Sequence, residues 1–177
     1  MVENPVQPPQ NALLPTFKHL GEGTSLAQQI YEMIGHSKFF ADFTREDVER
    51  LSAFMHVYRA EPGQTIIREG DVDDYMLLIV QGRVDIVKAD SHGKPQPMTT
   101  VGAGALIGEM SMIDGEPRFA TCVATEPTVF AVISRDSMVQ IILEEPSLGA
   151  KILIKLVTVL SQRLRKTSSN LLSYMAR

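Results

Sequence analysis

The residues best suited to chemistry lie close together between Gly104 and Ala124. Gly108 precedes a predicted helical turn that begins at Glu109, and Arg118 follows nine positions later. A helix start presents unpaired N–H groups and a partial positive charge, and a guanidinium presents donors that match phosphate oxygens. An ionised glutamate only accepts hydrogen bonds, so it suits a sugar hydroxyl. The pattern therefore predicts a site for a nucleotide.

The same segment resembles the phosphate-binding cassette of cyclic nucleotide-binding domains. The matching parts are Gly108-Glu109, the small and apolar run 110–113, and Pro117-Arg118 with the three residues after them. The nine-residue spacing resembles that of regulatory subunits of cAMP-dependent protein kinase. The resemblance implies that Glu109 binds the ribose 2′-hydroxyl and Arg118 the cyclic phosphate. It also implies help from the backbone N–H groups of Gly108, Glu109, Met110, Ser111, Met112 and Ala120.

A plainer interpretation of Glu109 and Arg118 is a surface ion pair across a loop. Charged residues are common near turns, and exposed pairs contribute little to stability. The matching flanks on both sides favour the nucleotide site instead.

Phe119 is where the sequence departs from the family pattern. The family usually has Ala, Ser or Thr after the arginine, and a hydroxyl there helps bind phosphate and, as Thr, favours guanine. A phenyl ring cannot donate or accept that hydrogen bond. The resemblance therefore implies cAMP as the ligand ahead of cGMP. The alternative is that the ring closes the pocket, so that the domain is a non-binding interaction or dimerisation module.

The chain is predicted to be mainly β with flanking helices. From residue 57, short β-branched segments alternate with glycine turns, and Gln81-Gly82 predicts a tight hairpin. The expected strands are 64–68, 75–80, 83–88, 98–101, 119–125 and 128–134. The family resemblance, which covers about residues 39–174, implies an eight-stranded double-stranded β-helix, a jelly-roll-like β-roll, over 57–135.

Helices and an arm are expected on either side of the β-roll. Residues 1–23 are rich in proline and predict a loosely ordered, flexible arm. Residues 24–56 predict N-terminal helices, one of them opened by Thr44 and Asp47 in a capping-box pattern. Residues 136–177 predict C-terminal helices, the first capped by Asp136 and the last running from 147 to about 175.

The last helix carries an apolar seam with alternating spacings of four and three. Its members are Leu153, Val157, Leu160, Leu164, Thr167, Leu171 and Tyr174. A helix of about 43 Å is longer than the β-roll on which it would pack. This length favours a parallel homodimer through the seam over packing of the whole seam on the chain's own β-roll. The run 163–168 also resembles the segment with which catabolite activator proteins contact adenine, which implies that Thr167 and Ser168 bind the base. For Thr167, a threonine bonded to its own helix carbonyl is an even alternative.

Several classes of protein are disfavoured. No apolar run reaches the ~20 residues of a membrane span, no signal peptide opens the chain, and the single Cys122 fits a cytoplasmic protein.

The four histidines are scattered, which disfavours a metal site or a cupin-like enzyme, and no nucleophile–base pair suggests catalysis. Six basic and no acidic residues lie in 151–177, a pattern that fits a solvated helix face better than a nucleic-acid or lipid site. The chain stops where transcription-factor members continue into a helix-turn-helix, so direct sequence-specific DNA binding is not expected.

Together these patterns predict a regulatory sensor and not an enzyme. A phosphate held by Arg118 draws in the cassette, and the base draws the last helix across the pocket, so that ligand shifts a conformational equilibrium. The signal then passes to an effector protein that the sequence does not identify.

Overall fold

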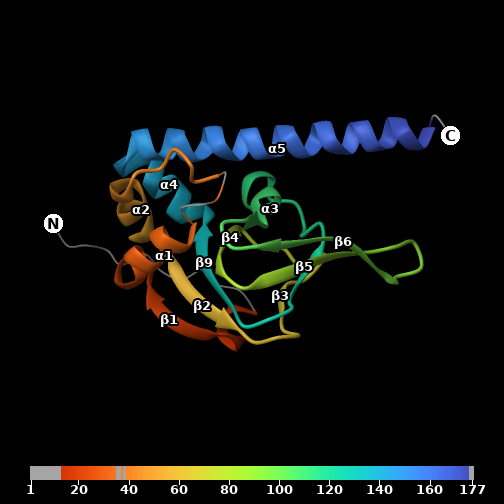
Figure 1. The fold of residues 1–177 in the computed structure, drawn as a ribbon, viewed down its shortest axis with the longest axis horizontal. Coiled ribbons are helices and arrows are strands. Elements are labelled where there is room, and N and C mark those ends of the chain that lie inside the picture. The colour runs from red at the N-terminus through yellow and green to blue at the C-terminus, as the bar shows by residue number, and fades with distance from the viewer. Residues whose placement is uncertain (1–12, 35–36, 38, 176–177) are drawn as a thin grey trace.

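The computed structural model describes residues 13–34, 37 and 39–175. Within these residues, nine strands form two antiparallel sheets, and helices cover one of them (Figure 1). The larger sheet has the order β1 (Lys18–Glu22), β2 (His56–Ala60), β9 (Thr128–Ser134), β4 (Tyr75–Gln81) and β7 (Leu106–Ile107). The smaller sheet has the order β3 (Thr65–Ile67), β8 (Thr121–Ala124), β5 (Arg83–Ala89) and β6 (Pro95–Gly102). The prediction of a mainly β protein with flanking helices is confirmed, and its architecture is that of the expected β-roll.

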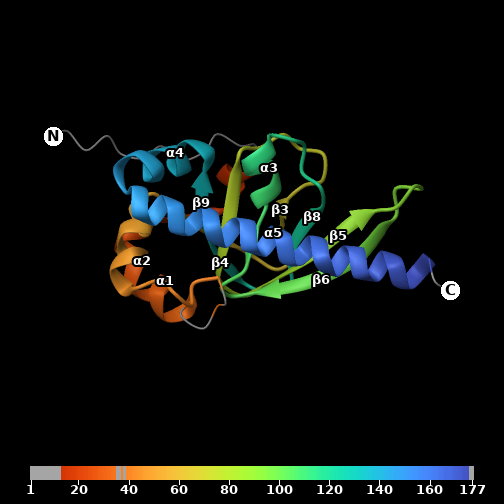
Figure 2. The same cartoon turned by 90° about the horizontal axis from the view of Figure 1, so that it is seen from above.

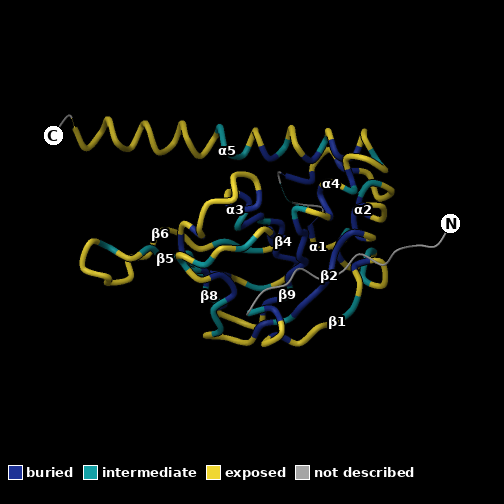
Figure 3. Tube along the Cα trace, turned by 180° about the vertical axis from the view of Figure 1, so that it is seen from behind, coloured by how far each residue is buried: buried dark blue, intermediate teal, exposed yellow. Residues whose placement is uncertain are grey.

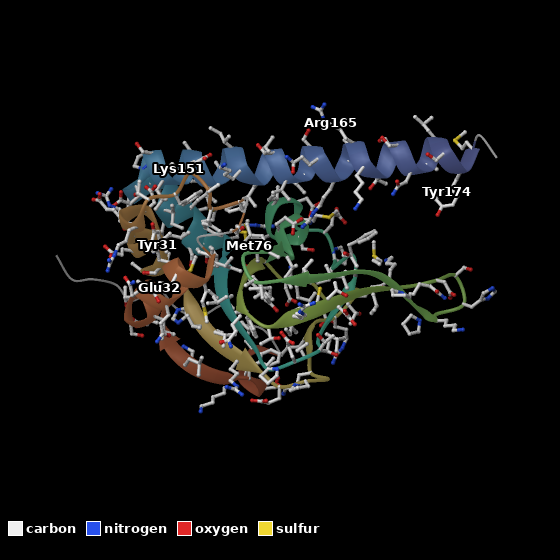
Figure 4. All side chains as sticks on the ribbon, in the orientation of Figure 1. Tyr31, Glu32, Met76, Lys151, Arg165 and Tyr174 are labelled. Carbon is white, nitrogen blue, oxygen red and sulfur yellow. The ribbon has the colours of Figure 1, made fainter. Side chains whose placement is uncertain are left out.

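Strand β4 separates the two halves of the hydrophobic core. Side chains alternate between the faces of a strand, so its seven residues can serve both. Tyr75, Leu77 and Ile79 pack between the two sheets. Met76, labelled in Figure 4, packs with Leu78 against the helices. The sequence of this strand therefore reads as a continuous apolar run because both of its faces are buried.

The helices that cover the larger sheet come from both ends of the chain. They are α1 (Ala27–Ile34), α2 (Arg45–Ser52), α4 (Arg135–Glu144) and α5 (Pro146–Met175), with short helices η1 (Leu14–Thr16) and η2 (Gly23–Leu26) near the start. The predicted capping box of Thr44 and Asp47 is confirmed at the start of α2. The predicted cap of α4 is wrong, because Ser134, in extended conformation, accepts the N–H of Ser137 and Asp136 lies in the first turn.

Helix α5 has an anchored half and an overhanging half (Figures 1 and 2). Leu148, Ile152 and Leu156 are buried against the body, and Lys151 Nζ lies 2.6 Å from an Asp47 carboxylate oxygen. From residue 162 to 175 every residue of the helix is exposed, as the yellow distal half in Figure 3 shows. The overhang runs above the β5–β6 hairpin, which projects from the same end of the molecule.

The structure differs from the predicted elements in three places. A loosely ordered arm was expected over 1–23, but η1 and β1 lie within residues 14–22. Leu14 and Phe17 are buried beside Phe130. Residues 1–12 of that arm lie outside the described residues. Gly82 does not close a hairpin, because β4 and β5 belong to different sheets. Strand β6 begins at Pro95, three residues before the strand expected over 98–101, and tolerates proline because it is an edge strand.

Candidate functional site

Gly108 allows the cassette to fold tightly around Arg118. It joins β7 to α3 (Glu109–Asp114) with φ 75°, in the left-handed region that favours glycine. A Cβ at this position would lie 2.6 Å from Arg118 Nη1. That nitrogen donates a hydrogen bond to the Gly108 carbonyl oxygen at 2.8 Å. Both the turn and the close approach of the guanidinium therefore require glycine.

Three groups contact the Arg118 guanidinium: the Gly108 carbonyl oxygen, the Asp73 carboxylate and the Tyr75 ring. Its Nε lies 3.4 Å from an Asp73 carboxylate oxygen, and its Cζ lies 4.4 Å from the centre of the Tyr75 ring. The residue is only 2% exposed, and its Nη2 has no hydrogen-bond partner among the described residues. A buried donor left unsatisfied costs free energy, about 1–3 kcal/mol for a neutral group and more for a charged one. An anion in the adjoining cavity would satisfy it.

Glu109 is equally buried, at 2% exposure, and is paired with α5. Arg163 Nη1 donates to Glu109 Oε1, and Arg163 Nη2 donates to the Leu106 carbonyl oxygen at 3.2 Å. Burial raises the pKa of the Glu109 carboxyl, and the charge of Arg163 acts in the opposite direction. The Glu109 carboxylate therefore lines the cavity while it is held by the Arg163 guanidinium.

A pocket that is partly open to solvent joins these residues, with about 450 Å³ of empty space when the solvent at its mouth is included. Seven predicted site residues line it: Gly108, Glu109, Met110, Ser111, Arg118, Phe119 and Ala120. The rest of the wall is Arg163 and the largely apolar set Ile67, Ile86, Ile107 and Cys122. Burial raises the pKa of the Cys122 thiol to about 12, so this group serves as a neutral wall.

Two further predictions meet different outcomes here. Glu109 and Arg118 do not form a surface ion pair, because both are buried and each has another charged partner. Thr167 and Ser168 are exposed on α5 and do not line the cavity. Their contact with a base stays a prediction that needs α5 to move.

The sequence reasoning missed Arg163 and Asp73 as site residues. Arg163 lies one helical turn before Thr167, so the face of α5 assigned to the base was nearly the right one. Asp73 belongs to an acidic loop before β4, and nothing in its spacing distinguishes it from its neighbours. Both contacts join residues at least 45 positions apart.

Phe119 leaves the cavity open. It is 51% exposed, and its ring lies under Lys88, whose Nζ is 4.6 Å from the ring centre. The closed pocket expected for a non-binding module is therefore absent from the described part of the chain. The same residues contain no group of three or more His, Cys, Asp or Glu side chains placed to hold a metal ion. No helix within them is long and apolar enough to span a membrane.

Comparison with known proteins identifies the family and the fold. The model of the cyclic nucleotide-binding domain matches residues 58–145. The crystal structure of a cyclic nucleotide-binding domain from Methylobacillus flagellatus KT is 42% identical, covers 92% of this chain and 91% of its own, and superposes with a TM-score of 0.80. The chain belongs to the cyclic nucleotide-binding domain family.

Two curated proteins are each similar to part of this chain. The acetyltransferase Pat of Mycolicibacterium smegmatis is 36% identical over 100 residues, which is 56% of this chain and 30% of that protein. The CRP-like cAMP-activated global transcriptional regulator of Mycobacterium tuberculosis is 28% identical over 140 residues, which is 79% of this chain and 61% of that protein. The chain thus spans less than two thirds of these curated relatives.

Proposed function

We propose that this domain binds a 3′,5′-cyclic nucleotide, with cAMP as the ligand, and acts as a regulatory sensor. The observation that carries the proposal is Arg118, a buried cavity-lining guanidinium whose Nη2 has no hydrogen-bond partner among the described residues. A cyclic phosphate carries one negative charge and matches that donor. The Glu109 carboxylate accepts the ribose 2′-hydroxyl. Relatives named as cAMP-activated or cAMP-bound support the choice of cAMP.

The response passes through α5. Arg163 connects this helix to Glu109 and to the Leu106 carbonyl oxygen, so the carboxylate that binds ribose also holds α5. Ribose binding changes the hydrogen bonding at Glu109. The populations of two α5 positions then shift by the difference in their affinities for ligand. One of these positions brings Thr167, one turn beyond Arg163, to the base.

The overhanging half of α5 provides the dimer interface. Its seam is exposed in the single chain, with Leu164 at 68%, Leu171 at 58% and Tyr174 at 74%. Figure 4 shows Arg165 on the face of the helix away from the β-roll, so charge borders the apolar stripe. A continuous apolar stripe of this kind marks an interaction surface. A second copy buries it in a parallel two-fold coiled coil, and the changed dimer is read by an effector protein.

Isothermal titration with cAMP and cGMP tests the ligand assignment. The protein is first shown by mass spectrometry to be free of copurified nucleotide. We expect cAMP and cGMP to compete for one site per chain, and we expect cAMP to bind more tightly than cGMP. Failure of a folded, ligand-free protein to bind either nucleotide contradicts the proposal.

A further inference from the structure

Phe119 occupies a position between the buried arginine and the open mouth of the cavity. The chain bends at Phe119 and Ala120, just before β8 starts. In a regular strand consecutive side chains point to opposite faces. The bend breaks this alternation, and Arg118 and Phe119 both line the cavity. An aromatic ring therefore lies next to the group assigned to the phosphate.

The ring is fixed by a network on the side away from the cavity. Lys88 Nζ lies 4.6 Å from the ring centre and 2.6 Å from Glu69 Oε1. Glu69 also accepts the Ala89 N–H at 2.9 Å, and its own N–H donates to Thr121 Oγ1 at 3.0 Å. Among the described residues that line the cavity, Phe119 is present and Lys88 is not. The ammonium lies over one face of the ring, and Phe119 also lines the cavity and is 51% exposed.

We propose that Phe119 is the platform on which the purine of the bound cyclic nucleotide stacks. This inference rests on the proposed function, because it places the base relative to a phosphate on Arg118 and a ribose on Glu109. The wall beyond these two residues is apolar, formed by Ile67, Ile86 and Cys122 with the Phe119 ring, and flat aromatic bases gain affinity by stacking on such rings. Phe119 lies just before β8 and not on α5, so the platform does not require α5 to move.

Stacking makes a specific prediction about purines and pyrimidines. A purine overlaps a phenyl ring over a larger area than uracil does, whereas phosphate and ribose contacts are the same for both. We expect the wild type to bind cAMP more tightly than cyclic uridine monophosphate. Phe119→Leu weakens cAMP binding by about 5- to 100-fold and weakens cyclic uridine monophosphate binding less. Phe119→Tyr keeps the ratio of the two affinities.

Met98→Leu is the matched control. Met98 is 53% exposed on β6, carries no ring and does not line the cavity. Its substitution should leave the affinity ratio unchanged. Because Phe119 is half exposed, its variants should fold, which thermal unfolding without ligand checks.

The outcomes separate this inference from the proposed function. Nucleotide binding by the wild type with the same ratio in Phe119→Leu overturns the stacking platform and leaves the phosphate and ribose assignments standing. A gain in affinity for both nucleotides overturns it too, because the ring would then be an obstruction. Lack of binding of either nucleotide by the wild type overturns the proposed function and the platform with it.

Discussion

The cassette around Arg118 and the distal half of α5 differ in how deeply their side chains are buried and in how many contacts hold them. In the cassette, Glu109 and Arg118 are each 2% exposed and held by charged neighbours. In the distal half of α5, every residue from 162 to 175 is exposed, and Arg163 is the contact with the cavity. Under the proposed function, the cassette is preorganised for a ligand, and the exposed half of α5 responds to it.

This difference assigns separate tasks to the two regions. Preorganised groups bind without paying for rearrangement, and a helix with few buried contacts changes position at low cost. Substitutions in the cassette should therefore change affinity, and substitutions on α5 should change assembly and response. The predictions that follow test this division from the largest effect to the smallest.

Arg118→Ala should have the largest effect. It removes the proposed partner of the cyclic phosphate, so cAMP affinity should fall at least ~100-fold by isothermal titration. Arg59→Ala is the control, because Arg59 forms an exposed ion pair with Glu61 and should leave affinity unchanged. Since Asp73 loses its buried partner, the unfolding temperature of Arg118→Ala must be measured alongside. Unchanged affinity in the folded variant removes the phosphate assignment.

Leu164→Asp should convert the proposed dimer into a monomer. An aspartate in the coiled-coil seam is buried without a partner in the dimer, whereas in the monomer it faces water. Light scattering during size exclusion measures the mass. Ser169→Asp adds the same charge about 140° around the helix and should leave the dimer intact. A wild type that is monomeric at all concentrations contradicts the assembly.

Glu109→Gln should weaken cAMP binding by about tenfold, because a charged acceptor for the ribose hydroxyl is replaced by a neutral one. Burial raises the pKa of Glu109, so in the wild type affinity should fall on acidification at a higher pH than for an ordinary glutamate. The same raised pKa favours the folded state at low pH, and this contribution is lost as pH rises through it. When cAMP affinity is measured across pH, Glu109→Gln should not show this fall on acidification. If the fall remains in the variant, another group causes it.

Asp47→Asn should have the smallest effect, because it alters only the start of α2 and the anchored half of α5, both away from the cavity. Burial opposes ionisation of Asp47, but hydrogen bonds from Lys151 and Thr44 hold its pKa below the ordinary value. Its contribution is therefore present above the unfolded pKa and lost as pH falls through the folded one. We expect a loss of about 1 kcal/mol in the free energy of unfolding near neutral pH. Cyclic nucleotide affinity should not change, and a large change would mean that the anchor takes part in binding.

Local patterns predicted the cassette and the strands, because their evidence lies within a few residues. Gly108, Glu109 and Arg118 stand within eleven positions, and Thr44 and Asp47 within four. Contacts between distant segments carried no such signal. Two such contacts form only in the completed fold: Lys18 pairs with Arg59 between β1 and β2, and Arg163 contacts Glu109. Proline-rich composition predicted an arm because it says nothing of the buried Leu14 and Phe17.

The most direct test of the division between binder and responder is amide hydrogen exchange along α5, with and without saturating cAMP. The account predicts that cAMP alters exchange in residues 161–175 and that Arg163→Gln, which still binds through Arg118, loses most of this change. Exchange in the anchored residues 148–156 should stay the same in both proteins. A distal half that does not respond to bound cAMP, or one that responds equally without the Arg163 guanidinium, would contradict it.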